Sequence, residues 1–195
     1  TGQVYGLGVN ATADTATLYL VDPQTGASTA IGVAGQIAFV TGAATPVDFP
    51  DSSVGYDIDF NPTVDRVRVI TGSGLNFRIN PITGAPVDGD AGVAGTNTDG
   101  SINGLTSSVH ATAYTNSFAG TGVTTQYTLD ATTNSFYIQT PPNAGTQTST
   151  LAVTDGTNPI DFSAPVGFDI LGSVAVTTSN APATGDGFFA ASVGG

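Results

Sequence analysis

The feature that most constrains the fold of this chain is an internal repeat of about 56 residues. The stretches VGYDIDF, VHATAYT and VGFDILG begin at residues 54, 109 and 166, which are 55 and 57 residues apart. Each stretch alternates apolar residues with other types, as a half-buried or interior strand does. The repeat therefore predicts a series of similar β units.

A second recurring element has the chemistry of a tight turn. LVDPQTGAS (20–28), RINPITGAP (78–86) and TLDATTNSF (128–136) share an apolar residue, an Asp or Asn, and a Gly or Asn four positions later. The Asp or Asn side chain caps the turn, Pro supplies a φ near −65°, and Gly or Asn takes the left-handed position. We therefore expect hairpin turns marked by Asp22, Asn80 with Gly84, and Asp130.

Together these elements predict an all-β fold. The middle unit reads as strands GYDIDF, DRVRVIT and LNFRIN followed by a short strand near residues 85–87, and the other units read similarly. Four short strands per unit indicate a propeller-like array of four-stranded antiparallel blades, with a β-sandwich as the alternative. We expect one β-repeat domain over residues 1–195, with units at approximately 1–53 (partial), 54–108, 109–165 and 166–195 (partial).

Each of the two end units has fewer than four expected strands. The chain begins at what would be the second strand of a blade and finishes with VGFDI, SVAVTT and GFFAAS. About three and a half blades are too few to close an ordinary ring, and open ends expose unpaired strand edges. We expect missing strands or strands of a partner chain to complete the array.

The composition favours strands and an exported protein. Charged residues make up 9% of the chain, against a typical ~25%, and all fifteen acidic residues are Asp. A chain without Glu or Lys but rich in Thr, Val, Gly and Asn favours strands over helices. The same bias is typical of bacterial surface or secreted proteins, so we expect an extracellular or cell-surface location.

The net charge and the hydropathy of the sequence limit the kinds of partner that we expect. A net charge of −12 repels nucleic acid and anionic membranes, and no stretch approaches the ~18 apolar residues of a membrane helix. We therefore expect no nucleic-acid partner and no membrane insertion. The chain has no Cys, which excludes disulfides and thiolate metal sites.

The middle unit resembles the signature of a domain-of-unknown-function family of secreted bacterial proteins. FNPTVDRVRV (60–69), GLNFRINPITG (74–84), DGD (88–90) and AYTN (113–116) match the family's core in order. TLDATTNSFYIQTPPNAG (128–145) and VGFDI (166–170) also look like family segments. The resemblance implies a propeller-type repeat domain of exported proteins, with a further unit before the point where this chain begins and further strands after its end. It gives no activity to carry over to this chain.

All of the positive charge lies within thirteen residues, beside a strand that carries two Asp residues. If these neighbouring strands pair, carboxylates can face guanidiniums, which take carboxylates bidentately. We interpret this as an internal charge network that fixes strand register, with an anion or glycan-carboxylate site as the alternative. The predicted network consists of Asp57, Asp59, Asp65, Arg66, Arg68 and Arg78.

The loop DGDAGVAGTNTDG is a candidate calcium loop. Hard cations prefer carboxylate and carbonyl oxygens, which Asp88, Asp90 and Asp99 would supply. The spacing matches neither an EF-hand nor a nonapeptide calcium repeat. A plain solvated loop is therefore the competing interpretation, and no other cofactor is expected.

No catalytic constellation is visible. His110 is the single histidine, and no G-x-S-x-G stretch accompanies it. Asp57, Asp59 and Asp169 could form a carboxylate pair for glycoside hydrolysis, but Asp57 and Asp169 occupy equivalent repeat positions, which favours a structural role.

We expect a non-enzymatic structural or binding protein that self-associates by strand addition. The alternatives are a glycan- or calcium-binding module and a propeller hydrolase. The aromatic residues best placed for contact with a partner are Phe49, Phe118, Phe188 and Phe189.

Overall fold

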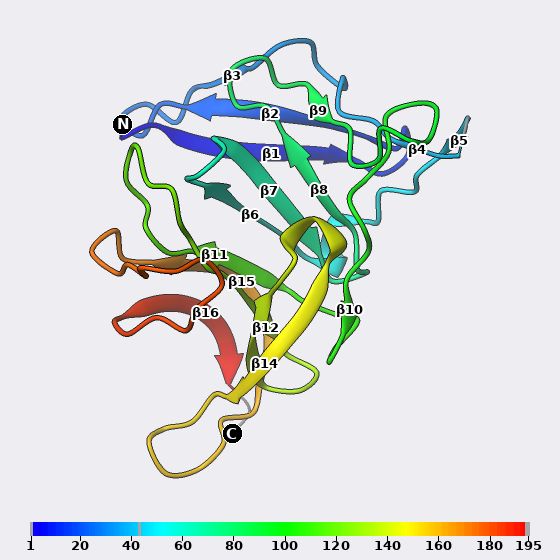
Figure 1. The fold of residues 1–195 in the computed structure, drawn as a ribbon. Helices are drawn as coiled ribbons and strands as arrows, with labels where there is room; N and C mark the ends of the chain where they lie inside the picture. The colour runs from blue at the N-terminus through cyan, green and yellow to red at the C-terminus, as the bar shows by residue number, and fades with distance from the viewer. Residues whose placement is uncertain (1, 43, 194–195) are drawn as a thin grey trace.

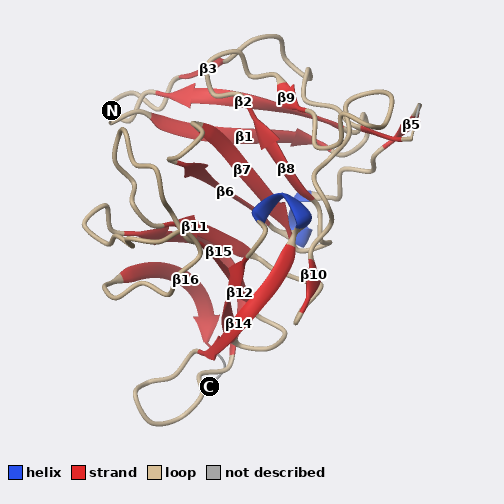
Figure 2. Cartoon of the chain, in the orientation of Figure 1, coloured by secondary structure: helices blue, strands red, loops and turns tan. Residues whose placement is uncertain are grey.

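The computed structural model describes residues 2–42 and 44–193, and most of its regular structure is β-strand (Figure 2). Two short 3-10 turns, η1 (Ser52–Val54) and η2 (Pro142–Ala144), interrupt the strands. Within the described ranges, no helix has both the length and the apolar character needed to cross a membrane.

The middle sheet is a four-stranded antiparallel meander with the strand order β6-β7-β8-β9. Its register sets Asp59 opposite Arg68 and Val69 opposite Phe77. Alternation puts Val67, Val69, Phe77 and Ile79 into the core. The sequence-based strand prediction for this unit is confirmed by β6 (Tyr56–Asn61), β7 (Arg66–Thr71), β8 (Asn76–Ile79) and β9 (Pro86–Val87).

The first sheet is a three-stranded antiparallel meander of β1 (Val4–Asn10), β2 (Thr15–Val21) and β3 (Ser28–Ala30). It packs on the middle sheet around a core that includes Leu18, Ile37 and Phe39. The segment between the two sheets contains the hairpin of β4 (Val40–Thr41) and β5 (Thr45–Pro46).

The third sheet has the order β10-β14-β13-β12-β11. Four of its strands are an antiparallel meander, whereas the two-residue β10 pairs parallel with β14. This strand comes from the long loop after β9, so the third sheet takes a strand from the preceding unit. The strands are β10 (Asn103–Gly104), β11 (Ala111–Tyr114), β12 (Gln126–Asp130), β13 (Ser135–Gln139) and β14 (Thr146–Ala152).

The last sheet contains two strands, β15 (Phe162–Ile170) and β16 (Gly187–Val193). The strand expected at SVAVTT (173–178) is wrong, because this segment has no strand geometry. Instead, the Asn116 side chain donates to the Val176 carbonyl at 3.0 Å and accepts from the Val176 amide at 2.9 Å. One side chain therefore takes the place of a neighbouring strand.

The sheets follow one another through the molecule, from β1–β3 to β15–β16 (Figure 1). The strands β6, β11 and β15 lie against one another where the last three sheets meet. β6–β9 fall within the predicted unit 54–108 and β11–β14 within 109–165, while β15 begins at Phe162, before the boundary expected at 166. The molecule is thus an all-β assembly of several antiparallel sheets.

Aromatic residues fill much of the interior. Phe49, proposed from the sequence as a partner contact, is instead buried with its ring 5.5 Å from that of Phe77. Its amide is fixed by a hydrogen bond to the Asp14 carboxylate, which draws the loop inward. Phe118 and Phe188 are exposed, as a partner contact requires.

Candidate functional site

Arg68 is the centre of a buried polar cluster between the middle and third sheets. The side chain is fully buried, and its guanidinium donates to Tyr114 Oη at 3.3 Å, Asn76 Oδ1 at 2.8 Å and Asn143 Oδ1 at 2.6 Å. It also pairs with the Asp99 carboxylate. These partners come from β8, β11, η2 and the loop after β9, so one side chain joins two sheets. A guanidinium enclosed in this way is not available to an external anion.

The carboxylate of Asp99 holds a second arginine. Arg78 donates from Nε to Asp99 Oδ2 and from Nη2 to Asp99 Oδ1, each at 2.7 Å, which is bidentate pairing. Arg66 instead donates to the Val64 and Asp65 carbonyls at the β6–β7 turn. Arg68 and Arg78 therefore share one internal network through Asp99, whereas Arg66 bonds only turn carbonyls, and the predicted carboxylate partners are wrong.

The two Asp residues of β6 bind backbone amides. Asp59 faces Arg68 in register, yet its carboxylate accepts from its neighbour Phe60 and from the Tyr114 amide at 2.6 Å. Asp57 accepts from the Thr112 amide at 2.8 Å. Burial raises the pKa of both Asp57 and Asp59 to about 7, although their hydrogen bonds to backbone amides act to lower it. The two side chains join β6 to the edge of β11, and Asp65 lies in the exposed turn.

The buried cluster continues into the third sheet through side-chain amides. Tyr114 Oη donates to Gln126 Oε1 at 2.8 Å, and Gln147 donates to Gln139 Oε1 at 2.9 Å. Gln139 in turn donates to the Pro142 carbonyl at 2.7 Å. Throughout the described residues, every buried side-chain nitrogen and oxygen atom has a hydrogen-bond partner. A cluster that is satisfied internally fixes how two sheets dock.

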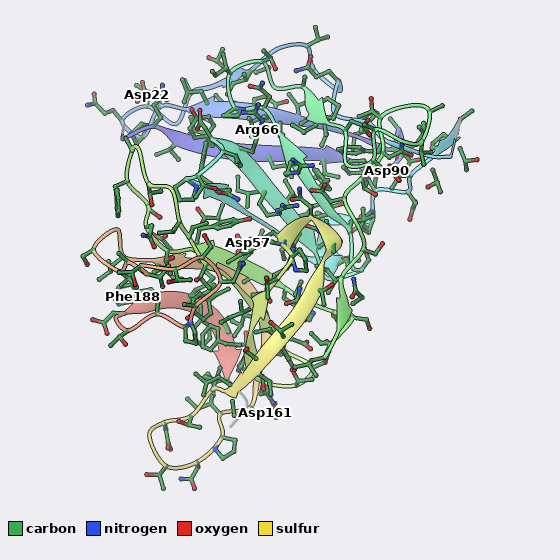
Figure 3. All side chains as sticks on the ribbon, in the orientation of Figure 1. Asp22, Asp57, Arg66, Asp90, Asp161 and Phe188 are labelled. Carbon is green, nitrogen blue, oxygen red and sulfur yellow. The ribbon has the colours of Figure 1, made fainter. Side chains whose placement is uncertain are left out.

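The candidate calcium residues are divided between two environments. Asp99 is buried between the two arginines, whereas Asp88 accepts from the Asp90 and Asn97 amides and Asp90 accepts from the Gly92 amide. The amide hydrogen bonds lower the pKa of Asp88. In residues 2–42 and 44–193, no three acidic or histidine side chains are grouped as a metal site requires. Figure 3 shows Asp90 of this loop well apart from Asp57 of β6 and Arg66 of β7, two residues of the predicted charge network.

His110 is half-buried and packs at the turn after β12. Its Nδ1 accepts from the Ala131 amide at 3.3 Å, which requires the neutral imidazole. Burial lowers the pKa of His110, and the charge of Asp130 only partly opposes this. Asp130 is itself buried and accepts from Thr106 and Thr132. These contacts are those of a structural residue.

The predicted turn residues form the expected hydrogen bonds. Asp22 accepts from the Gln24 amide and Asn80 from the Ile82 amide, at 2.8 and 2.9 Å. Gly84 closes the second turn with φ +67°. Asp130 caps a turn between β12 and β13, whereas Asn80 caps one between β8 and β9, so these turns are alike in chemistry but connect different strands of their sheets.

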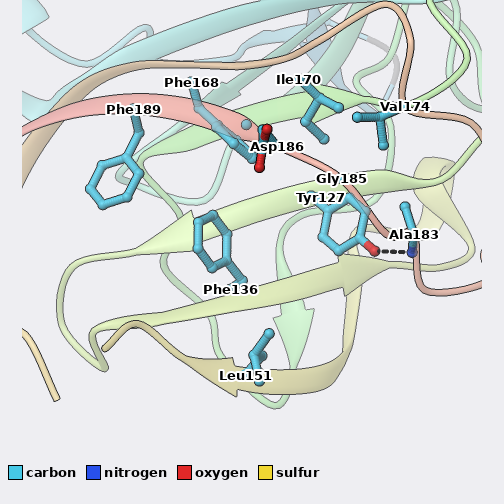
Figure 4. Close-up of a pocket in the computed structure, with 11 residues that line it drawn as sticks. Tyr127, Phe136, Leu151, Phe168, Ile170, Val174, Ala183, Gly185, Asp186 and Phe189 are labelled. Carbon is cyan, nitrogen blue, oxygen red and sulfur yellow. Dashed lines mark hydrogen bonds between the residues drawn. The ribbon is translucent and has the colours of Figure 1, made fainter. Parts of the chain in front are cut away.

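An apolar pocket of about 280 Å³ lies between the third sheet and β15–β16 (Figure 4). Phe136 and Leu151 line it from the third sheet, and Phe168 and Phe189 line it from the last sheet. Leu151 is 68% exposed beside this opening, and Phe188 on the other face of β16 is 63% exposed. The pocket is thus an incompletely covered apolar surface next to an edge strand.

The roles of several of these residues could not be predicted from the sequence, for a physical reason. Asp99 was a candidate calcium ligand and not an arginine partner, and the contacts of Asn116, Asn143 and Gln147 were not predicted. These side chains act over long sequence separations, and no local period marks them. The only available signal was compositional: a single charged cluster in a chain this poor in charge must find its counter-ions within the chain.

The chain was compared with known protein families, curated proteins and solved structures. A family model described as a domain of unknown function, DUF4394, matches residues 1–193. No curated protein and no solved structure matches the chain. The match assigns no activity, and the chain belongs to the DUF4394 family of domains of unknown function.

Proposed function

We propose that this chain is an exported, non-enzymatic structural or binding protein of the cell surface that self-associates by strand addition. The observation that carries the proposal is the outer edge of β16. Five of its seven residues are exposed, and within the described part of the chain it is hydrogen-bonded only to β15. An edge of this length without a covering element is a template for another strand.

The backbone geometry defines which groups are free on this edge. The Leu171 amide donates to the Asp186 carbonyl, which sets the alternation of hydrogen bonds between β15 and β16. Residues in an antiparallel pair point their N–H and C=O alternately toward and away from the partner. Gly187 and Phe189 accordingly direct these groups outward. The bulge opposite Ala191 adds its extra residues to β15 and not to β16, so β16 keeps its alternation and Ala191 points its groups outward as well.

The proposal includes a propeller-like arrangement in which the described residues give the last blade two strands. Consecutive strands form each main meander, and β6, β11 and β15 lie together as the inner strands of neighbouring blades would. On this interpretation the described residues supply two strands of the last blade, and Leu151 stays exposed beside them. Strand addition would complete that blade.

The composition of the chain supports a location outside the cell. The chain has no Lys, Glu or Cys, and its polar character comes from Thr, Ser, Asn and Gly. The sequence resemblance to secreted bacterial proteins points the same way. A fractionation experiment on the native host, with the chain found in the cytoplasm, would overturn this part of the proposal.

The alternatives receive less support from the described residues. Of the carboxylates that could form a hydrolase pair, Asp57 and Asp59 are engaged by backbone amides, and none of Asp57, Asp59 and Asp169 lines the apolar pocket. A calcium-binding role would have to use Asp88 and Asp90 without Asp99. A glycan site would have to use surfaces other than the buried Arg68.

The test compares Ala191→Pro with Ala191→Ser in analytical ultracentrifugation over a wide concentration range. Pro removes an outward N–H and is tolerated in edge strands, whereas Ser retains the N–H and approximates the size of Ala. We expect the parent chain and Ala191→Ser to associate and Ala191→Pro to remain monomeric. A parent chain that is monomeric at every concentration contradicts the proposal.

A further inference from the structure

We propose that the partner strand at the β16 edge is β16 of a second copy, in an antiparallel, two-fold symmetric pairing centred on Ala190. This inference rests on the proposed strand addition and names its partner and register. Two copies joined in this way would form a continuous sheet with the order β15-β16-β16-β15. Two-fold dimers are the commonest symmetric assemblies.

β16 is a more available edge than β1. Every interior residue of β1 is half-buried and only its two terminal residues are exposed, whereas β16 is exposed at five positions. Pairing β1 of one copy with β16 of another would also be heterologous, which closes only if the rotation permits. Pairing of β16 with itself needs one surface and closes at two copies.

The sequence of β16 suits this register. Centring the pair on Ala190 places Gly187 opposite Val193 and Phe189 opposite Ala191, so all seven residues of each strand are paired. The outward N–H and C=O groups of Gly187, Phe189 and Ala191 then meet outward groups of the other copy. Ala190 faces its own counterpart in a non-hydrogen-bonded pair, where Cα atoms lie about 4.5 Å apart.

Charge favours contact at this edge over contact elsewhere. The chain carries a net charge of −12, so two copies repel one another over most of their surfaces. The strand GFFAASV contains no charged residue and no proline. An approach along this strand therefore brings no carboxylates directly opposite one another within the paired residues.

The apolar pocket provides room for side chains of the second copy. Residues directly opposite in a sheet lie on the same face, so Val193 of one copy would lie beside Gly187 of the other. Gly187, Phe168 and Phe189 line the pocket, and Val193 is 65% exposed. An added Cβ at Gly187 would approach the Phe168 ring to 3.0 Å, so a glycine suits this position and β16 presents no side chain of its own there. In the proposed pairing Val193 of the second copy would lie at the rim of this pocket, whose lining residues are drawn in Figure 4.

The experiment uses the absence of cysteine in the chain. Ala190→Cys places one thiol at the two-fold centre, at a Cα separation within the 4.4–6.8 Å range of disulfides. Ser192→Cys is the matched control, because Ser192 is exposed on the same face of the same strand. In the proposed register the two copies of residue 192 are about 13 Å apart, beyond disulfide reach.

Both variants are incubated with oxidised and reduced glutathione, and non-reducing electrophoresis follows the covalent dimer. We expect Ala190→Cys to form it at least tenfold faster than Ser192→Cys, and the difference to disappear in urea. Equal rates in the two variants, or faster reaction of Ser192→Cys, overturn the register.

Failure of this inference is distinguishable from failure of the proposed function. If ultracentrifugation shows association that Ala191→Pro abolishes but Ala190→Cys does not cross-link preferentially, strand addition stands and the symmetric partner is wrong. If the chain is monomeric throughout, both are wrong. Circular dichroism of each variant verifies that the sheet content is unchanged.

Discussion

The Tyr114 backbone amide donates to the Asp59 carboxylate at 2.6 Å across 55 residues of sequence. Thr112 and Asp57 repeat the relationship at 2.8 Å with the same separation. In both cases a side chain of β6 accepts from an amide on the free edge of β11, which among the described residues has β12 as its one hydrogen-bonded strand. The sheets are therefore joined by carboxylates placed at every second residue of one strand.

These two carboxylates predict an unusual dependence of stability on pH. Burial raises the pKa of Asp57 and Asp59 in the folded chain to about 7, above the 3.8 of an ordinary Asp. Between about pH 4 and 7 the folded state thus binds more protons than the unfolded state, and its stability falls as pH rises. We expect a higher free energy of unfolding at pH 5 than at pH 8, measured by urea denaturation.

His110 acts in the opposite direction, because burial lowers its pKa and favours the neutral form. The double variant Asp57→Asn/Asp59→Asn isolates the carboxylates, since it retains His110. Its stability should no longer fall between pH 5 and 8. A parent chain that is equally stable at both pH values, or more stable at pH 8, would contradict the assignment.

The paired arginines predict that Asp99 is the most important acidic residue for stability. Asp99→Asn removes the charge shared by buried Arg68 and by Arg78, leaving a buried cation without its partner. Breaking a buried ion pair from one side costs about 3–5 kcal/mol. We expect a loss of this size in the free energy of unfolding.

Asp90→Asn is the matched control for Asp99→Asn. Asp90 lies in the same loop, is exposed, and uses one oxygen to accept from the Gly92 amide, which Asn can also do. Its cost should be within about 0.5 kcal/mol. Similar losses for the two variants would show that Asp99 does not neutralise the arginines.

Gly26 and Gly84 occupy the same position in two equivalent turns, and substituting each by Ala tests how the first and middle sheets pack. Gly26 and Gly84 have φ +74° and +67°, but an added Cβ meets nothing at Gly26 and collides with the Ile31 carbonyl at Gly84. Gly26→Ala should cost about 1–2 kcal/mol from left-handed strain alone. Gly84→Ala should cost about 1–3 kcal/mol more, measured by thermal and urea unfolding. Equal costs would mean that the turn does not pack on Ile31.

Much of the fold was predictable because its signals are local. Alternating apolar residues and Asx turns located β6, β7 and β8 and the turn at Asn80. Partner choice was not predictable, because Asp99 reaches Arg68 only after a loop closes. Alternation also gave a wrong strand at SVAVTT. Val174 there is buried by packing on Ala113 and Ile170, and the Val176 backbone is hydrogen-bonded by the Asn116 side chain and not by a strand.

Asn116 supplies a further prediction. It has φ +58° and its side chain satisfies both backbone groups of Val176. Asn116→Gly keeps the backbone conformation but removes both hydrogen bonds, which should cost about 1–3 kcal/mol. It should also speed hydrogen exchange at the Val176 amide, while the Asn180→Gly control, at an exposed left-handed position, leaves that amide unchanged. Unchanged exchange in Asn116→Gly would count against this role.

The most direct test of strand addition is amide hydrogen exchange along β16 as a function of protein concentration. Phe189 and Ala191 direct their amides away from β15, so a monomer leaves both open to solvent. The account predicts that protection at these two amides rises with concentration, while the Phe188 and Ala190 amides, already bonded to β15, change little. Exchange at Phe189 and Ala191 that is fast and independent of concentration would contradict it.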